Sequence, residues 1–411
     1  MLSLFIYDRI NHIGKEEIMK QLFNILILVL LAAVGLVSCG GGGGGGGEGT
    51  PAAQTSKLPK TGQIVSYDTN TVKTDDGALQ EGVAWPSQRF SVASSGTGTV
   101  VTDNLTGLMW PQDASTPTFT GTTSTCTGGA LTWQGALDYV SCLNTNSYLG
   151  HTDWRLPNRK ELRSLADYSK FNLALPAGQP FTNVQIFYDY WSSTTFAFST
   201  PEAVIVGMID GSVSASGKIN VQSVWPVRDA AITATVLLPK TGQIVSYDTN
   251  TVKADDGAMQ EGVAWPSPRF SVASSGTETV VTDNLTGLMW PQDASTPTFT
   301  GTSSTCTGGT LTWQGGLDYV SCLNTNSYLG HTDWRLPNVN ELESLIDAST
   351  SSPALPAGHP FTKVQASYYW SSTTYAGNTS LAFSVHVGAG YVYEYNKTTT
   401  NYYVWPIRSG Q

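Results

Sequence analysis

Two clusters of carboxylates have the residue types that could hold a metal ion. Asp75 and Asp76 precede a glycine, Glu81 follows shortly after, and the pattern returns later in the chain. The six candidate ligands are Asp75, Asp76, Glu81, Asp255, Asp256 and Glu261. Oxygen ligands of this kind suit Ca²⁺, so calcium is the one cofactor that the sequence suggests. The spacing is not that of an EF-hand loop, and the alternative is a solvated Asp-Gly turn.

The cysteines suggest one lipid attachment site and two disulfide bonds. Cys39 follows an apolar leader, and the other four cysteines fall into two pairs: Cys126 with Cys142, and Cys306 with Cys322. One even pair inside each half of an exported chain predicts one disulfide in each half. A redox or metal role is the alternative, but no C-x-x-C motif and no nearby histidine accompanies either pair.

The tryptophans are the side chains best suited to stacking on a sugar. The chain has 12 of them. Most are expected in the core, where large aromatic rings contribute most to stability. Four are candidates for exposed stacking platforms: Trp191, Trp225, Trp370 and Trp405.

Other polar motifs favour structural roles. His151 and Asp153 flank a threonine before a Trp-Arg-Leu-Pro motif; a turn that positions the tryptophan is favoured over a metal or acid–base pair. Arg155 and its counterpart Arg335 are expected to form buried ion pairs with acidic residues of a following helix. The Ser-Ser-Thr-Thr run at 192–195 has no G-x-S-x-G elbow and no evident base, so we do not expect an enzyme.

The elements that position these residues alternate between strands and helices. Short strands are predicted at Arg89–Val92, Thr99–Thr102 and Leu108–Trp110, separated by turn residues. Apolar spacing predicts a helix over Leu131–Asn144. A second helix should begin after Asn158, with Glu161 completing a capping box. The second half of the chain ends in an alternating strand pair, so the expected class is α+β with antiparallel sheet.

The body of the chain is a tandem duplication. Residues 58–158 differ from residues 238–338 at only seven of 101 positions, whereas the halves that follow diverge. We therefore expect one domain at 58–229, a linker at 230–237 and a second domain at 238–411. Any difference in ligand preference between the repeats should lie in their C-terminal halves.

One contrast between the repeats lies on the capped helix. It reads Arg-Lys-Glu-Leu-Arg from Arg159 in the first repeat and Val-Asn-Glu-Leu-Glu from Val339 in the second. The two faces could dock on each other, but two solvated faces are the favoured interpretation.

The N-terminal residues resemble a lipoprotein leader. Residues 22–37 form an apolar run of signal-peptide length, and translation is expected to start at Met19, whose Lys20 supplies the basic start. The run ends in Leu-Val-Ser-Cys, which resembles a bacterial lipobox and implies acylation of Cys39. An ordinary signal peptide with an incidental cysteine is the alternative. Residues 1–39 are thus a leader, and the glycine-rich stretch 40–57 is a flexible tether. Because Gly40 is not aspartate, the resemblance implies the outer membrane.

Five ordered features look like the Lcl C-terminal domain family. They are Thr102–Trp110, the helix from Trp133, the Asp153–Asn158 string with Glu161 and Leu162, Tyr190–Thr195, and Val224–Arg228, and all recur in the second repeat. A more distant similarity to formylglycine-generating enzymes implies a C-type-lectin-like fold. Those enzymes use a C-terminal cysteine pair, which neither repeat has, so their activity is not implied.

The founding family member is a collagen-like adhesin implicated in binding glycosaminoglycans. Its ligand is not carried over, because the first repeat has ten basic against fourteen acidic residues and the second has seven against thirteen. A net charge of −10 also argues against a nucleic-acid partner.

The sequence therefore predicts an outward-facing lipoprotein of the bacterial cell envelope that acts in binding or adhesion, with a surface glycan as the first candidate partner. A structural envelope protein that contacts other surface proteins is the alternative. An uncharacterised hydrolase is the least favoured reading.

Overall fold

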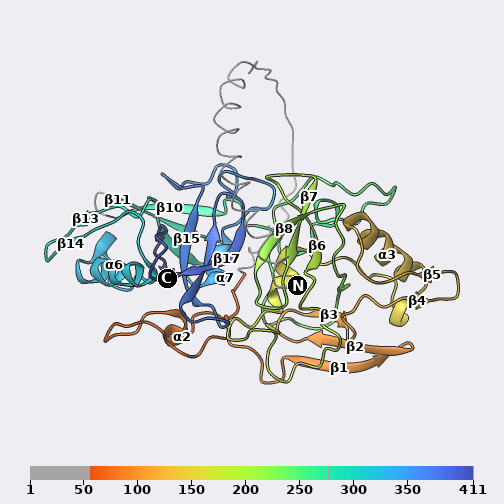
Figure 1. Ribbon diagram of the computed structural model, residues 1–411. Coiled ribbons are helices and arrows are strands. Elements are labelled where there is room, and N and C mark those ends of the chain that lie inside the picture. Colours follow the sequence, from red (N-terminus) through yellow and green to blue (C-terminus); the bar gives the residue numbers. More distant parts are fainter. Residues whose placement is uncertain (1–55, 276–277, 411) are drawn as a thin grey trace, which may run out of the picture. The chain divides into compact units, whose positions relative to one another are not determined.

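Each repeat combines two small sheets with helices, which confirms the predicted α+β class (Figure 1). The computed structural model describes residues 56–275 and 278–410. The first repeat contains α2 (Asp76–Leu79), β1 (Phe90–Ser95), β2 (Gly98–Asp103), β3 (Leu108–Pro111), β4 (Phe119–Thr120), β5 (Thr125–Cys126), α3 (Trp133–Thr145), η1 (Tyr148–Gly150), α4 (Arg159–Ser164), β6 (Tyr190–Thr195), β7 (Glu202–Val206), β8 (Val213–Gly217) and β9 (Arg228–Asp229). The second contains α5 (Asp256–Met259), β10 (Phe270–Ser275), β11 (Glu278–Asp283), β12 (Leu288–Pro291), β13 (Phe299–Thr300), β14 (Thr305–Cys306), α6 (Trp313–Thr325), η2 (Tyr328–Gly330), α7 (Val339–Ser344), β15 (Tyr368–Thr374), β16 (Leu381–His386), β17 (Tyr391–Asn396) and β18 (Arg408–Ser409).

The predicted helices form where their caps and apolar spacing place them. The Thr132 side chain accepts a hydrogen bond from the amide of Gly135 and starts α3, whose apolar face is buried. Asn158 caps α4, and the Glu161 side chain accepts from the Asn158 amide to complete the predicted capping box. The second repeat has the same box at Asn338 and Glu341.

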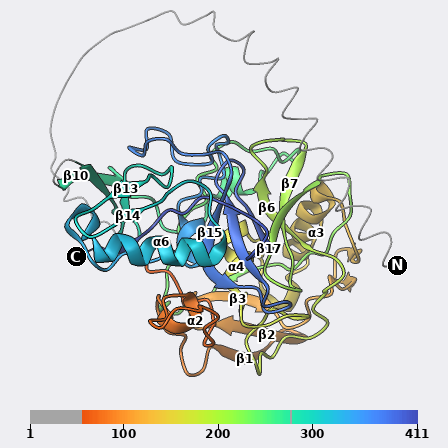
Figure 2. The same ribbon diagram turned by 60° about the vertical axis from the view of Figure 1, so that its left-hand side comes forward.

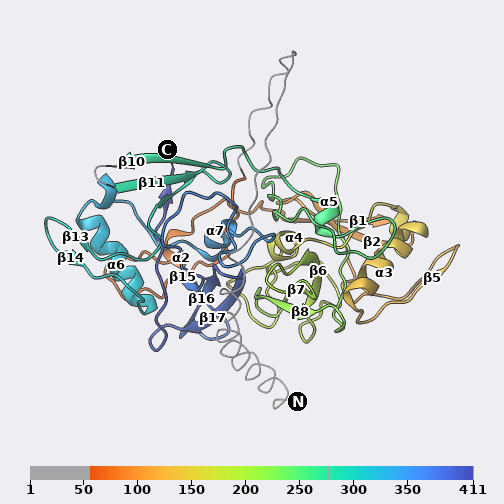
Figure 3. The same ribbon diagram turned by 90° about the horizontal axis from the view of Figure 1, so that it is seen from above.

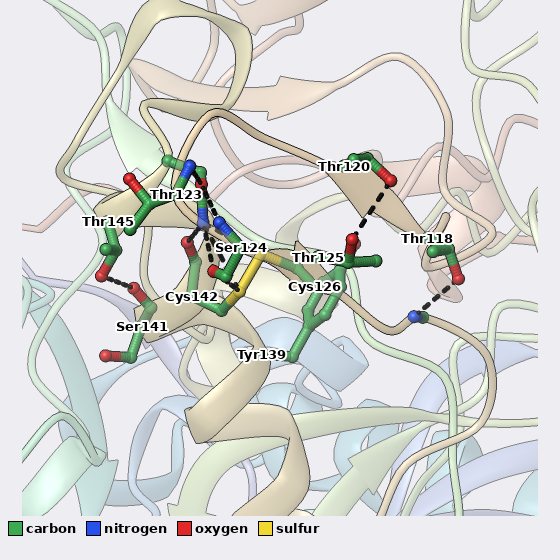
Figure 4. The surroundings of a disulfide bond; sticks show 12 residues. Thr118, Thr120, Thr123, Ser124, Thr125, Cys126, Tyr139, Ser141, Cys142 and Thr145 are labelled. Atoms are coloured by element: carbon green, nitrogen blue, oxygen red, sulfur yellow. Dashed lines mark hydrogen bonds between the residues drawn. A yellow bond between two sulfur atoms is a disulfide. The ribbon is translucent and has the colours of Figure 1, made fainter.

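The predicted disulfides are both present. Cys126 at the end of β5 joins Cys142 on α3, and the Cα atoms lie 5.7 Å apart; Cys306 joins Cys322 in the same way. Figure 4 shows serine and threonine side chains around the first bond, including Ser124, whose hydroxyl lies 3.6 Å from the Cys142 sulfur. The bond fastens the β4–β5 hairpin to the helix, which adds about 3 kcal/mol in the loop-entropy model.

A single six-stranded sheet joins the repeats. Its order is β15-β16-β17-β8-β7-β6, so one half comes from each repeat, and Figure 2 shows the two halves side by side. The halves meet where Val392 on β17 pairs with Val213 on β8. Both valines are buried in one hydrophobic core that contains residues of both repeats. The repeats therefore fold against each other as parts of one compact unit.

The capped helices α4 and α7 also meet at this junction. Arg159 and Arg163 of α4 form ion pairs with Glu343 of α7, at 3.2 and 3.0 Å, and all three side chains are buried. The expectation of two solvated faces was therefore wrong. The helices differ in sequence because the basic residues of α4 and the acidic Glu343 of α7 pair with each other in a buried contact.

The N-terminal segments of the repeats reach across to the opposite repeat. We call residues 58–85 the first arm and residues 238–265 the second arm. Helix α2 of the first arm packs beside β15, and α5 of the second arm packs beside β6, as Figure 3 shows. The side-chain oxygen of Gln63 accepts from the Thr374 amide, and that of Gln243 accepts from the Thr195 amide, at 3.0 and 2.9 Å. The arms thus exchange places with near two-fold symmetry.

Among residues 56–275 and 278–410, no helix is both long and apolar enough to cross a membrane. The leader, Cys39 and nearly all of the tether lie outside the described residues.

Removing the interface carboxylate should test this shared core. Glu343→Gln leaves the two arginines of α4 buried without a counter-charge, and breaking a buried pair in this way costs about 3–5 kcal/mol. We expect a large fall in the free energy of unfolding, measured by urea denaturation. The control Glu202→Gln changes a half-exposed carboxylate on β7 and should have little effect. Equal stability of Glu343→Gln and wild type would contradict the proposed importance of the contact.

Candidate functional site

The four tryptophans considered as sugar platforms are buried, so that prediction was wrong. Trp191, Trp225, Trp370 and Trp405 all have 0 % exposure. The indole nitrogens of Trp191 and Trp225 donate to the carbonyl oxygens of Leu131 and Pro111. Their polar atoms are thus satisfied inside the protein, and no ring face remains available to a ligand.

The carboxylates considered as calcium ligands are separated by other partners. Asp75 accepts hydrogen bonds from the amides of Tyr67 and Asp68, while Glu81 lies 3.8 Å from Arg335 of the other repeat. In the described part of the chain, no three His, Cys, Asp or Glu side chains converge on a possible metal position. The alternative of a solvated turn also fails, since Asp75 is only 1 % exposed. The second cluster repeats the pattern, with Glu261 lying 3.9 Å from Arg155.

Asp76 and Asp256 instead connect the arms to the opposite repeats. Asp76 accepts hydrogen bonds from Thr61 of its own arm and Thr373 of the other repeat, both at 2.7 Å. Asp256 accepts equivalent bonds from Thr241 and Thr194. Burial raises the pKa of Asp76 to about 7 and that of Asp256 to about 6, with the threonine hydroxyls opposing the shift.

The turn before the Arg-Leu-Pro motif is held by ordinary structural contacts. Asp153 pairs with Arg228 at 2.7 Å, and its pKa is lowered by hydrogen bonding to that arginine. The His151 ring lies edge-on to Trp154, with 5.8 Å between centroids. Arg155 forms the expected buried pair, with 2.6 Å to Glu161, and Arg335 does the same with Glu341.

Two lysines that sequence reasoning missed lie at the arm contacts. Lys218 donates to the Thr195 hydroxyl at 2.8 Å and lies 4.0 Å from the ring centroid of Trp133 and 4.8 Å from that of Tyr247 on the second arm. Lys397 makes the same contacts in the second repeat. Burial lowers the pKa of each lysine to about 8. Thr195 has 0 % exposure, so this pair fastens an arm and offers no hydroxyl to a substrate. One sequence signal could have revealed these lysines: Lys218 and Lys397 occupy corresponding positions in the C-terminal halves of the repeats, which otherwise differ.

A tyrosine cluster lies on the second repeat's part of the central sheet. Tyr368 on β15, Tyr395 on β17 and Tyr402 near the chain end are each half-buried. Their ring centroids lie 4.8–5.0 Å from one another, and His386 lies 4.5 Å from Tyr368. We call these four residues the tyrosine cluster. Each side chain of the cluster is partly exposed, so the cluster reaches the surface.

The first repeat keeps the backbone of this region but lacks the rings. Leu131 bridges to Gln222 as Leu311 bridges to Tyr402, so Gln222 is the counterpart of Tyr402. The counterpart of Tyr395 is Ser216, and the Gln222 amide donates to its hydroxyl at 3.4 Å. The sequence signal for the tyrosine cluster is the Tyr-x-Tyr-x-Tyr run at 391–395, which by itself predicts only a strand. The region falls in the divergent half, where differences in ligand preference were expected.

Two copies of one α+β domain, each with its own disulfide and joined through a common core, define a tandem-repeat protein. The model of the Lcl C-terminal domain matches residues 99–228 and 279–408. The chain belongs to the Lcl C-terminal domain family, as the motifs suggested, and both arms lie outside the matched residues. Comparison with proteins of curated function gives no match.

Replacing the two buried arm carboxyls should change how stability depends on pH. An unfolded aspartate loses its proton near pH 4, but Asp76 and Asp256 keep theirs to about pH 7 and 6. Between pH 4 and these higher values the folded state therefore holds more protons than the unfolded state. The contribution of the two aspartates to stability falls as pH rises through this range. Asp76→Asn with Asp256→Asn removes this loss, so we expect the variant to gain stability relative to wild type from pH 5 to pH 8.

The measurement is the difference in free energy of unfolding between wild type and the double variant. Histidines that also titrate in this range contribute equally to both proteins, so their contribution cancels in the difference. Asp138→Asn, on the exposed side of α3, is the control and should leave the pH dependence unchanged. A difference that stays constant from pH 5 to pH 8 would show that the buried carboxyls do not titrate as described.

Proposed function

We propose that this protein is a lipid-anchored surface protein of the bacterial envelope that binds neutral carbohydrate through the tyrosine cluster of its second repeat. The observation that carries the proposal is the group of Tyr368, Tyr395 and Tyr402 rings in mutual contact at the surface. Family membership supports a domain of this type but does not identify a ligand.

Tyrosine clusters suit carbohydrate because both partners are amphipathic. A pyranose ring has an apolar face of C–H groups and a rim of hydroxyls, and a tyrosine offers an apolar ring with a polar tip. Tyrosine also loses little conformational entropy on binding, which makes it effective in recognition surfaces. In the cluster the rings already support one another, so a ligand would have little ordering to impose.

Charge favours a neutral sugar over an anionic one. The second repeat has seven basic against thirteen acidic residues. A sulfated or phosphorylated glycan would therefore meet a net negative field. This argues against transfer of a glycosaminoglycan ligand from the adhesin that the sequence resembles.

The leader supports the location. An acylated Cys39 would anchor the chain, and the glycine-rich stretch after it would let the folded part reorient above the bilayer.

The test replaces cluster residues by their first-repeat counterparts. Tyr395→Ser with Tyr402→Gln should weaken glycan binding by the full-length chain at least tenfold, since it removes two stacking rings at about 1 kcal/mol or more each. Neutral glycan arrays identify the sugar, and titration calorimetry measures its affinity.

Tyr188→Ser is the matched control, because Tyr188 is 50 % exposed on the first repeat and lies outside the cluster. It should bind as wild type does. Thermal melting checks that each variant is folded. If the wild type binds no glycan, or the double variant binds as tightly, carbohydrate recognition by the cluster is wrong; a single dominant protein cross-linked in intact cells would then favour the structural envelope role.

A further inference from the structure

A small pocket lies where the capped helices and both arms come together. Its volume is about 40 Å³. Side chains of α4 and α7 line it, together with the first residues of each arm: Leu58, Lys60, Lys160, Arg163, Leu238, Asn340 and Glu343. The pocket is separate from the tyrosine cluster and is formed only by the two repeats together.

Three buried cations of α4 lie beside this pocket. They are Arg159, Lys160 and Arg163. On the facing helix α7, Glu341 is paired with Arg335, and Glu343 pairs with both arginines of α4, at 3.2 and 3.0 Å. The carboxylates of α7 are thus paired with arginines, and none of them accepts a hydrogen bond from Lys160.

Lys160 is the cation without a partner. Its side chain is 6 % exposed, and in the described part of the chain its Nζ has no hydrogen-bond acceptor. An ammonium with three donors is not stable in such a place without an anion to receive them. Burial lowers the pKa of Lys160 to about 8, so the group is still mainly charged at pH 7.

The other charged groups near Lys160 are already engaged. Arg269 adds positive charge and is paired with Asp283 at 3.1 Å. Asp347 attracts the ammonium electrostatically, but its Oδ1 accepts hydrogen bonds from the amide and the hydroxyl of Ser349. Neither group accepts a hydrogen bond from the Lys160 Nζ.

The matching position in the second repeat shows what simple packing requires. Asn340 replaces the lysine there; its amide donates to the Pro59 carbonyl at 3.1 Å and its oxygen accepts from Arg163 at 3.2 Å. A neutral, fully bonded side chain therefore fits this frame. The charged residue at 160 is an addition that packing does not explain.

We propose that the pocket binds one small oxyanion, a carboxylate or an inorganic phosphate, held by Lys160 and Arg163. Lysine and arginine together are the side chains that bind such groups through charge-assisted hydrogen bonds. The volume is enough for a few water molecules or for a small polyatomic group in their place. The bound anion would tie the two repeats together, so anion binding and the stability of the shared core should be linked.

The test measures binding of inorganic phosphate and of acetate to the full-length chain at pH 7 and constant ionic strength. Titration calorimetry should detect saturable binding of at least one of them, and competition between the two identifies the preferred chemistry. Saturating anion should also raise the Tm by about 2–5 °C. Lys160→Asn should weaken binding at least tenfold, yet melt no lower than anion-free wild type, because the variant no longer buries an ammonium without a hydrogen-bond acceptor.

Lys170→Asn is the matched control, since it removes one exposed lysine beyond the same helix and should bind as wild type does. Lys160→Met provides a second neutral variant of similar length and should lose binding as Lys160→Asn does. Absence of saturable binding in wild type, or unchanged binding in the two Lys160 variants, would overturn the proposal.

Discussion

The carboxyl group of Asp76 joins parts of the chain that are far apart in sequence. It accepts hydrogen bonds from Thr61 of its own arm and from Thr373, which lies 297 residues away on the opposite repeat. Asp256 repeats this arrangement on the other side. Through these contacts each arm covers the half-sheet of its partner, and the ion pairs of α4 and α7 then close the space between them. The six-stranded sheet, the shared core and the pocket beside Lys160 all depend on this exchange.

The two repeats have nearly the same sequence where each makes the same contacts, and they differ in sequence where they meet each other. The first arm is nearly identical in sequence to the second arm, and α3 is nearly identical to α6, because the two members of each pair make equivalent contacts. The capped helices differ, because a helix facing its own copy would bring like charges together, whereas Arg159 and Arg163 face Glu343. The tyrosine cluster lies in the divergent half, at some distance in sequence from the conserved arms. Under the proposed function, binding is therefore confined to one repeat while the scaffold remains symmetric.

Local sequence signals predicted the local structure well. The capping boxes, the long helix and the first meander follow from patterns over a few residues, and the disulfides follow from one cysteine pair in each repeat; the structure confirms all of them. Predictions that needed long-range packing were less successful. Nothing near Trp191 indicates that other elements cover it completely, and the Asp75–Asp76 pair resembles a turn until the opposite repeat buries it. The arm exchange has no local signature, since an arm has the same sequence whichever repeat it covers. The tyrosine cluster was visible as a run of letters, but only the sheet brings Tyr368 and Tyr402 to it.

The exchange of arms also constrains how the molecule can be made. Gln63 lies 311 residues before Thr374, and its side-chain oxygen accepts a hydrogen bond from the amide of that strand residue. At synthesis rates of about 5–20 residues per second, the first arm exists for roughly 15–60 seconds before its partner strand does. The first repeat therefore cannot complete its native contacts as it emerges, and maturation waits for the last strands. A nascent chain interrupted between the repeats would carry an arm with no surface to cover, which gives quality-control proteases a simple way to tell an incomplete molecule from a finished one.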